Sequence, residues 1–323
     1  LNLPSLTSEV LGFQTFRRTV TNVGNATSTY TASVSVPGFA AQVTPSSLTL
    51  APGESGSYTL QVLRTSAAFQ NWVFGNLDWS DGSKTVRSPV TVKSIPLLVQ
   101  REVSDNRVRA NKSLTLLTGF DGTLGATTTT GMQPATRTPG TVLLGESNCS
   151  VAFNVPAGTK ALRVATYDAD SSGGSAGRDD LDLELYRGNV QVGGSGGATA
   201  AESITLLSPA AGTYTVCVVG FGSSRPGATS SSYVLSSWLL GSGIPNSLRA
   251  SAPARVETAG TGTVTLLWSV PAGQRYLGLV GFTGSDGATL ASTLVSIDDQ
   301  PAPVANAATE ARAAAKVALK AKR

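Results

Sequence analysis

The sequence of 323 residues contains no histidine. This absence excludes a Ser-His-Asp triad, a Cys-His pair and any zinc site that uses histidine ligands. The sequence also has no phosphate loop of the G-x-x-x-x-G-K type and no C-x-x-C motif. Because a recognisable nucleophile and base are missing, we expect this chain alone to have no enzymatic activity.

Charge is also scarce, because Asp, Glu, Lys and Arg make up only 14% of the residues. The segment Pro301–Arg323 accounts for the whole net charge of +4. A nucleic-acid partner would need clustered basic and aromatic residues on the folded body, so we expect none. We predict that residues 301–323 form a basic, alanine-rich tail, helical or disordered, which is either solvated or docked on an anionic surface.

Long apolar runs are the third absence. No run approaches the ~18 residues of a membrane-spanning helix, so we expect no membrane span. The sequence begins LNLPSLTSEV, without an initiator Met and without the pattern of a signal peptide. This beginning favours a fragment of a longer chain.

What the sequence does contain is a series of strand patterns. From Tyr30 to Val36, apolar residues alternate with Thr and Ser, so one face of a strand is apolar and the other polar. In APGESG, Pro52 and Gly53 suit a tight turn between two such strands. The chain is also too long for a single core. We therefore predict an all-β protein of two or three consecutive antiparallel β-sandwich domains.

Three motifs lie in order within the first 93 residues: RTVTNVG, VTPSSLTLAPGES and WSDG followed by VRSP. Together they resemble the fibronectin-III-like domain that follows the catalytic domain in cucumisin-like subtilases of peptidase family S8. The resemblance implies that residues 1–94 form such a sandwich. It also implies a secreted protein in which a protease catalytic domain, with its Asp, His and Ser, lies upstream.

The motifs VPAGT, DDLDL and PAAGTYTV resemble the bacterial pre-peptidase C-terminal domain, a small β-sandwich, which we assign to residues 141–242. Residues 243–300 look like the Ig-like segment that ends bacterial subtilases, but they show too few strands for an independent sandwich. Residues 95–140 are either a linker, with Thr127–Thr130 as a loop, or they complete that last sandwich. In the second case the middle domain is an insertion.

A candidate calcium loop lies in DADSSGGSAGRDDLD. Calcium prefers six to eight oxygen ligands, and Gly173 suits the sharp turn of a calcium loop. Asp179 stands where that template has a bidentate Glu, so further ligands must come from the next strand. The candidate ligands are Asp168, Asp170, Ser172, Asp179, Asp180 and Asp182. The alternative is a polar loop whose Asp and Ser side chains cap their own turns.

The two cysteines, Cys149 and Cys217, fall in the same predicted domain. In a secreted chain an even pair predicts a disulfide, and the alternative is two buried free thiols. The four tryptophans lie in or near strand patterns, so we predict that they belong to the core, with exposed binding platforms as the alternative. They are Trp72, Trp79, Trp238 and Trp268.

Two functions are compatible with these features. The resemblance implies a non-catalytic accessory region of a secreted subtilisin-like endopeptidase, which stabilises the enzyme and binds protein substrate. The alternative is a stand-alone extracellular adhesion or self-assembling structural protein, whose exposed strand edges pair between copies or bind a matrix polymer.

Overall fold

The computed structural model describes residues 3–241 and 243–300. In this part of the chain nearly all regular structure is β-strand, apart from two short 3-10 turns, which confirms the predicted all-β class. No helix among these residues has the length and hydrophobicity needed to cross a membrane. The predicted tail, residues 301–323, lies outside the described residues.

The first sandwich uses the strands up to Ser94. One sheet has the order β1-β8-β7-β3-β5 and the other the order β2-β6-β4. Their apolar faces enclose a core in which the rings of Tyr58 and Trp79 lie 5.2 Å apart. The strands are β1 (Leu6–Val10), β2 (Phe13–Thr21), β3 (Ser28–Ser35), β4 (Phe39–Thr44), β5 (Ser47–Leu50), β6 (Ser55–Arg64), β7 (Trp72–Ser80) and β8 (Thr85–Ser94).

The third sandwich is built from two separate stretches of sequence. One sheet has the order β10-β26-β25-β12-β23, with β13 also paired to β25, and the other has the order β22-β24-β11-β9. The first stretch supplies β9 (Leu97–Leu98), β10 (Glu102–Asp105), β11 (Arg109–Thr118), β12 (Gly122–Thr129) and β13 (Gln133–Pro134). The second supplies β22 (Leu248–Ser251), β23 (Arg255–Val256), β24 (Thr261–Ser269), β25 (Arg275–Gly284) and β26 (Thr289–Asp298).

The structure therefore has the discontinuous arrangement, in which strands after Leu97 complete the last sandwich. β11 and β24, which pair antiparallel from Arg109 with Ser269 to Leu117 with Thr261, come from the two different stretches. The expectation that Thr127–Thr130 is a loop was wrong over its first three residues, which belong to β12 and pair with β25. Threonine is β-branched and fits a pleated strand once a partner strand is present.

The second sandwich is inserted between these two stretches. It begins at β14, a few residues before the predicted boundary, and its sheets have the orders β14-β21-β16-β19 and β15-β20-β17-β18. Cys149 on β15 and Cys217 on β20 form the predicted disulfide. The elements are β14 (Thr136–Leu143), β15 (Ser147–Val155), β16 (Ala161–Ala165), η1 (Asp168–Asp170), η2 (Gly174–Ala176), β17 (Asp179–Arg187), β18 (Val190–Ser195), β19 (Ser203–Leu207), β20 (Gly212–Ser223) and β21 (Ser230–Leu240).

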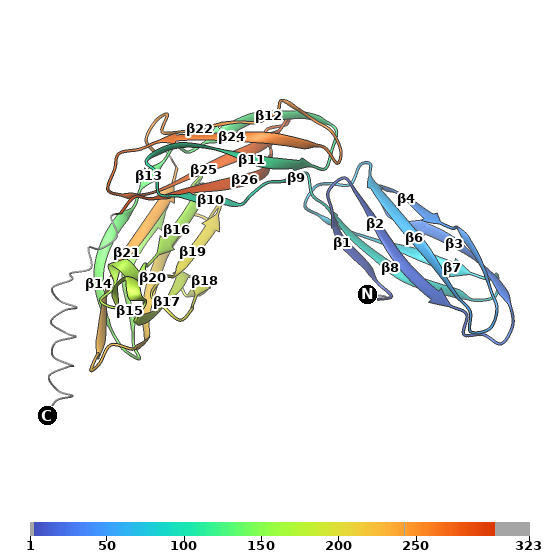
Figure 1. Cartoon of the computed structure of the whole chain (residues 1–323), viewed down its shortest axis with the longest axis horizontal. Helices are drawn as coiled ribbons and strands as arrows, with labels where there is room; N and C mark the ends of the chain where they lie inside the picture. The colour runs from blue at the N-terminus through green and yellow to red at the C-terminus, as the bar shows by residue number, and fades with distance from the viewer. Residues whose placement is uncertain (1–2, 242, 301–323) are drawn as a thin grey trace, which may run out of the picture.

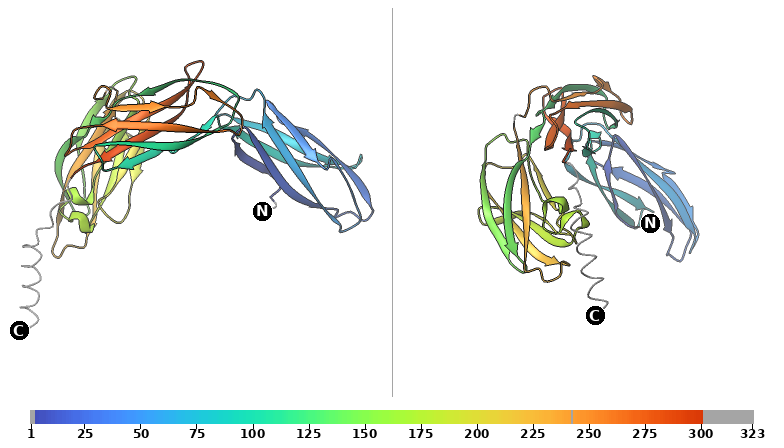
Figure 2. Two further views of the ribbon diagram at one scale, coloured as in Figure 1. Left: turned by 45° about the horizontal axis from the view of Figure 1, so that its top comes forward. Right: turned by 60° about the vertical axis from the view of Figure 1, so that its left-hand side comes forward.

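The third sandwich occupies the middle of the molecule, with the first at one end and the second beneath the other end (Figures 1 and 2). The first and third sandwiches meet at a small junction. There the rings of Phe69 and Phe120 lie 5.6 Å apart. Gly12, in the turn between β1 and β2, has a φ of +82°, and a Cβ added to it would lie 2.5 Å from Thr258. The two sandwiches therefore approach each other closely at this junction.

Candidate functional site

The predicted calcium loop connects β16 to β17 and contains η1 and η2. Asp168, at its start, accepts a hydrogen bond on Oδ1 from the backbone N–H of Ala200, at 2.9 Å. Asp170, two residues later, receives the guanidinium groups of Arg137 and Arg275. The first two predicted ligands therefore have different partners, and their carboxylates do not converge on one point.

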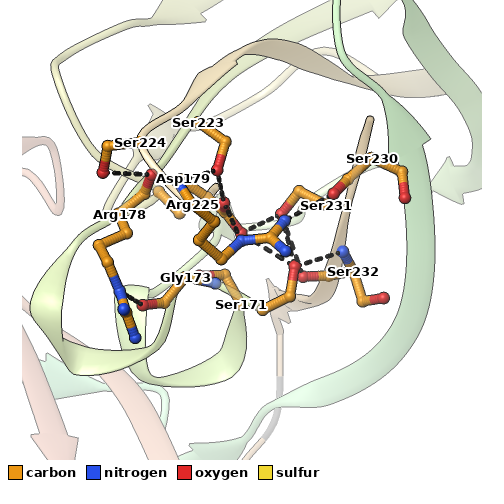
Figure 3. A network of polar contacts seen from close by, with 12 residues as sticks. Ser171, Gly173, Arg178, Asp179, Ser223, Ser224, Arg225, Ser230, Ser231 and Ser232 are labelled. Atoms are coloured by element: carbon orange, nitrogen blue, oxygen red, sulfur yellow. Dashed lines mark hydrogen bonds and ion pairs between the residues drawn. The ribbon is translucent and has the colours of Figure 1, made fainter. Parts of the chain in front are cut away.

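Asp179 is fully buried at the start of β17 and lies at the centre of a polar network (Figure 3). Its Oδ1 accepts hydrogen bonds from Arg225 Nε and from Ser223, each at 2.6 Å. Its Oδ2 accepts hydrogen bonds from Ser231 at 2.6 Å and from Ser172 at 2.9 Å. Four donors thus satisfy both oxygens of this carboxylate, as a buried charge requires.

The network determines the ionisation of Asp179. Burial by itself raises the pKa of this carboxyl group, but hydrogen bonds from the Arg225 guanidinium and the three serine hydroxyls outweigh burial and lower the pKa to about 2. Gly173 allows the close approach of the loop, because a Cβ added there would lie 2.4 Å from the backbone nitrogen of Asp179. The loop is held to the sandwich by this buried charge.

Asp180 and Asp182 point away from Asp179, on the outer face of β17. The alternation predicted for this strand is present, because Leu181, Leu183 and Leu185 are buried on the core face. Burial and, after it, the charge of Asp182 raise the pKa of Asp180. One oxygen of Asp180 is buried and has no hydrogen-bond partner in the part of the chain that the structure describes.

The six predicted ligands are therefore not gathered around one point. Among residues 3–241 and 243–300, no group of three or more Cys, Asp or Glu side chains is placed to hold a metal ion. The physical reason is that arginines supply the positive charge: Arg225 pairs with Asp179, and Arg137 and Arg275 pair with Asp170. The donor set does not fit calcium in this arrangement, and calcium binding stays a prediction.

Asp170 instead joins the second sandwich to the third. Arg275 on β25 is 3% exposed, and besides Asp170 its guanidinium contacts Asp298 at 2.9 Å. The same group stacks on the ring of Tyr167, 3.7 Å from the ring centroid. Burial lowers the pKa of Arg275, but the two carboxylates outweigh it and raise the pKa overall. This arginine is therefore a charged bridge between two sandwiches.

A second arginine bridges the same two sandwiches. Arg163 on β16 donates two parallel hydrogen bonds to Glu102 on β10, at 2.7 and 2.6 Å, and its Nε donates to Thr205 on β19 at 2.7 Å. The two sandwiches also share an apolar interface, formed by Ala161, Ala165, Trp238, Leu240, Leu277 and Leu294. The second and third sandwiches are thus packed as one body.

The first sandwich presents an aromatic face that the sequence analysis missed. Trp72 and Phe74 stand on the outer face of β7 and are 45% and 72% exposed. The Lys93 ammonium lies 5.1 Å from the centroid of the Trp72 ring and forms an ion pair with Glu9 at 2.5 Å. The prediction that all four tryptophans are core residues was wrong for Trp72 and right for Trp79, Trp238 and Trp268.

The signal that identifies Trp72 was present in the sequence WVFGNLDWS. Successive residues of a strand face opposite sides, so Trp72 and Trp79 point to opposite faces of β7. Asn76 and Asp78 share the face of Trp72, whereas Leu77 shares that of Trp79. The polar partners indicate that Trp72 faces outward.

The outer face of the other sheet in this sandwich is different. It carries hydroxyl groups that bond to one another across β2 and β6, with Thr19 and Ser57 at 2.9 Å and Thr21 and Ser55 at 2.7 Å. The same face also carries Phe13 on β2 and Leu63 on β6, which are in register with each other and are 53% and 46% exposed. The two outer faces therefore differ in arrangement: hydroxyl pairs line part of this one, whereas two neighbouring aromatic side chains stand together on β7 as a candidate interaction surface.

Comparisons with known proteins agree with the predicted resemblance. Residues 1–92 match the fibronectin type-III domain family model, and residues 150–220 match the bacterial pre-peptidase C-terminal domain model. A subtilisin-like protease of Glycine max is 46% identical over 98 residues, which are 29% of this chain and 12% of that protein. Subtilisin-like protease SBT4.6 of Arabidopsis thaliana is 41% identical over 97 residues, 28% of this chain and 13% of that protein.

The CO(2)-response secreted protease of Arabidopsis thaliana is 44% identical over 86 residues, 26% of this chain and 11% of that protein. The chain thus spans only a small part of the length of these relatives. Among solved structures, the secreted serine protease VesC from Vibrio cholerae aligns over 70% of this chain and 48% of that chain, at 12% identity and a TM-score of 0.24. At that score the likeness indicates nothing further about this chain. The family matches confirm the predicted fibronectin-III-like and pre-peptidase C-terminal domains.

Proposed function

We propose that this chain is the non-catalytic accessory region of a secreted subtilisin-like serine endopeptidase, and that its first sandwich stabilises the catalytic domain by docking against it. The relatives that support the proposal are proteases in which the matching segment is about an eighth of the protein. The observation that carries the docking is the aromatic face formed by Trp72 and Phe74.

The position of β1 supports this face as the docking surface. β1 is the edge strand of the same sheet and pairs with β8, which pairs with β7. Thr7 on β1 is in register with Thr91, and Thr91 with Phe74, so Phe74 lies two strand spacings from β1, roughly 10 Å. A domain that precedes Leu1 is therefore tethered beside the aromatic face. The ion pairs Lys93–Glu9 and Arg87–Asp78 flank the aromatic side chains with polar groups, as in the rim of an interface.

The test uses the complete protein encoded by the gene. We expect the reading frame upstream of Leu1 to encode a subtilisin-like catalytic domain. In that protein, Phe74→Ser should shorten the half-life of peptidase activity at elevated temperature by about 30-fold, because an aromatic side chain buried at an interface contributes about 2 kcal/mol and each 1.36 kcal/mol corresponds to a factor of ten.

The matched control is Thr59→Ala on the hydroxyl-bearing face, which should leave the half-life unchanged. An upstream sequence with a signal peptide directly before Leu1 contradicts the proposal. So does an unchanged half-life in the Phe74 variant.

The stand-alone structural protein is the second candidate, and the same face distinguishes it. If copies of this chain self-assemble, the aromatic surface should be covered by another copy. Sedimentation of the purified chain over a range of concentrations would then show oligomers that Phe74→Ser abolishes. A monomer at all concentrations supports the accessory region instead.

A further inference from the structure

A groove of about 760 Å³ lies where the three sandwiches meet. This volume is within the range of ligand-binding clefts, which form preferentially at domain interfaces. Leu98 from the third sandwich and Leu207 from the second line it, and their side chains are 52% and 53% exposed. Exposed leucines from two different sandwiches leave apolar surface in the groove for an occupant to cover.

One wall of the groove is a strand with an unpaired edge. β19 is the last strand of its sheet, and among residues 3–241 and 243–300 its one strand partner is β16. Backbone hydrogen bonds from Thr166 to Glu202 and from Ser208 to Lys160 establish which residues of the segment face β16. In an antiparallel pair, successive residues direct their backbone N–H and C=O groups alternately toward and away from the partner strand. The even-numbered residues of β19 therefore bond to β16, and the backbone groups of the odd-numbered residues point away from it.

The outward residues of β19 also line the groove with their side chains: Ser203, Thr205 and Leu207. The N–H of Ser203 donates to the Ser195 hydroxyl at 3.2 Å. The backbone N–H and C=O groups of Thr205 and Leu207 point away from β16. Within the described chain they have no strand partner. Figure 1 shows β19 on the side of the second sandwich that faces the first. A strand added here would therefore place alternate side chains in the groove.

The charges of the groove indicate what that strand should carry. Glu9 pairs with Lys93 and Glu102 with Arg163, so these four charges are compensated. Arg101 also lines the groove, is exposed, and forms no ion pair with the described residues. The uncompensated charge of the groove is therefore positive, which favours an acidic side chain in an occupant.

We propose that the groove binds an extended, unfolded segment of polypeptide as an additional strand on β19, with apolar side chains against Leu98 and Leu207 and an acidic side chain at Arg101. The identification of this segment as a substrate or product of the protease rests on the proposed function. Binding of the segment itself does not.

The probe is fluorescein-labelled casein, a disordered acidic polypeptide, titrated by fluorescence anisotropy with this chain alone. We expect saturable binding that Leu207→Ser weakens by about tenfold, because it removes apolar contact from the groove without adding charge. Leu98→Ser, on the third sandwich, should weaken binding to a similar degree. Both side chains are exposed, so unchanged thermal melting of the variants should verify that they fold.

The matched control is Leu143→Ser. Leu143 lies on β14, the opposite edge strand of the same sheet, and is 51% exposed, but it does not line the groove. This variant should bind casein like the unmodified chain. Equal affinity of all three variants would overturn the proposal, and so would the absence of any binding.

Hydrogen exchange supplies a second readout that reports on the backbone. Bound casein should slow exchange of the amides of Thr205 and Leu207. Protection confined to β10 or to the aromatic face of β7 would overturn the assignment to β19. Protection of β19 without casein, together with concentration-dependent dimers, would identify a second copy of this chain as the occupant and would also overturn it. The casein experiment uses this chain without a catalytic domain. A failure to bind casein therefore does not contradict the proposed docking of that domain on Trp72 and Phe74.

Discussion

The first sandwich and the pair formed by the second and third sandwiches differ in how they are held together. The core of the first sandwich is formed entirely by residues between Leu6 and Val92. The other two share an apolar interface and two arginine bridges, Arg163–Glu102 and Arg275–Asp170. We infer that the first sandwich is an autonomous unit attached to a composite one. Calorimetry can examine this contrast, because two such units should unfold in separate transitions.

The disulfide should give the largest effect. Replacing Cys149 and Cys217 by Ser removes a cross-link across a separation of 68 residues. Loop-closure entropy predicts a loss of about 4 kcal/mol from the free energy of unfolding of the composite unit. The transition of the first sandwich should not move. If both transitions shift together in calorimetry, the two units are not independent.

Acid should produce the next largest effect, through Asp179. Its pKa is about 2 in the folded state, below the ordinary value of 3.8, so its contribution to stability is complete above that ordinary value and is lost as the pH falls toward 2. The loss should be about 2 kcal/mol, at 1.36 kcal/mol for each pH unit. Denaturant unfolding of the composite unit, followed across this range, measures it.

The control for the acid experiment is Asp179→Asn. This variant should be less stable than the unmodified chain near neutral pH, because Arg225 then lacks its carboxylate. It should also lose the component of the acid dependence that Asp179 contributes. A variant that retains the full dependence would show that other carboxylates are responsible.

Separation of the two units should have the smallest effect. Residues 1–94 expressed alone lose the contact between Phe69 and Phe120, which as an aromatic pair contributes about 1 kcal/mol. We expect the free energy of unfolding of this fragment to lie within about 1 kcal/mol of that of the first sandwich in the whole chain. A fragment that does not fold would remove the distinction between autonomous and composite units.

Much of the strand pattern was predictable, because alternation of apolar and polar residues is a local property. Leu181, Leu183 and Leu185 face the core as the sequence DDLDLEL predicted. The cysteine pairing followed from their number and from the secreted context implied by the resemblance. The prediction for Trp72 was wrong because it relied on residue type. The alternation of faces along WVFGNLDWS would have placed Trp72 on the outer face.

The calcium loop shows where such reasoning ends. The spacing of acidic residues predicted a calcium site, which stays a prediction, but Asp170 and Asp179 pair with arginine side chains from elsewhere in the chain. Arg225 follows Asp179 by 46 residues, and Arg275 follows Asp170 by 105. A spacing rule examines only residues close in sequence, so it could not distinguish a set of metal ligands from carboxylates that pair with arginines distant in sequence.

The sequence by itself determined the fold class: the lack of histidine excluded a histidine-containing triad, and alternation predicted β-sandwiches. The motifs added a resemblance, which implies the accessory region of a subtilase. Only the tertiary structure decided that the second sandwich interrupts the third, that arginines join them, and that an aromatic face and an unpaired strand edge stay open. The reason is physical. Alternation and composition act within one strand, whereas pairing, burial and ion-pair partners depend on residues that only folding brings together.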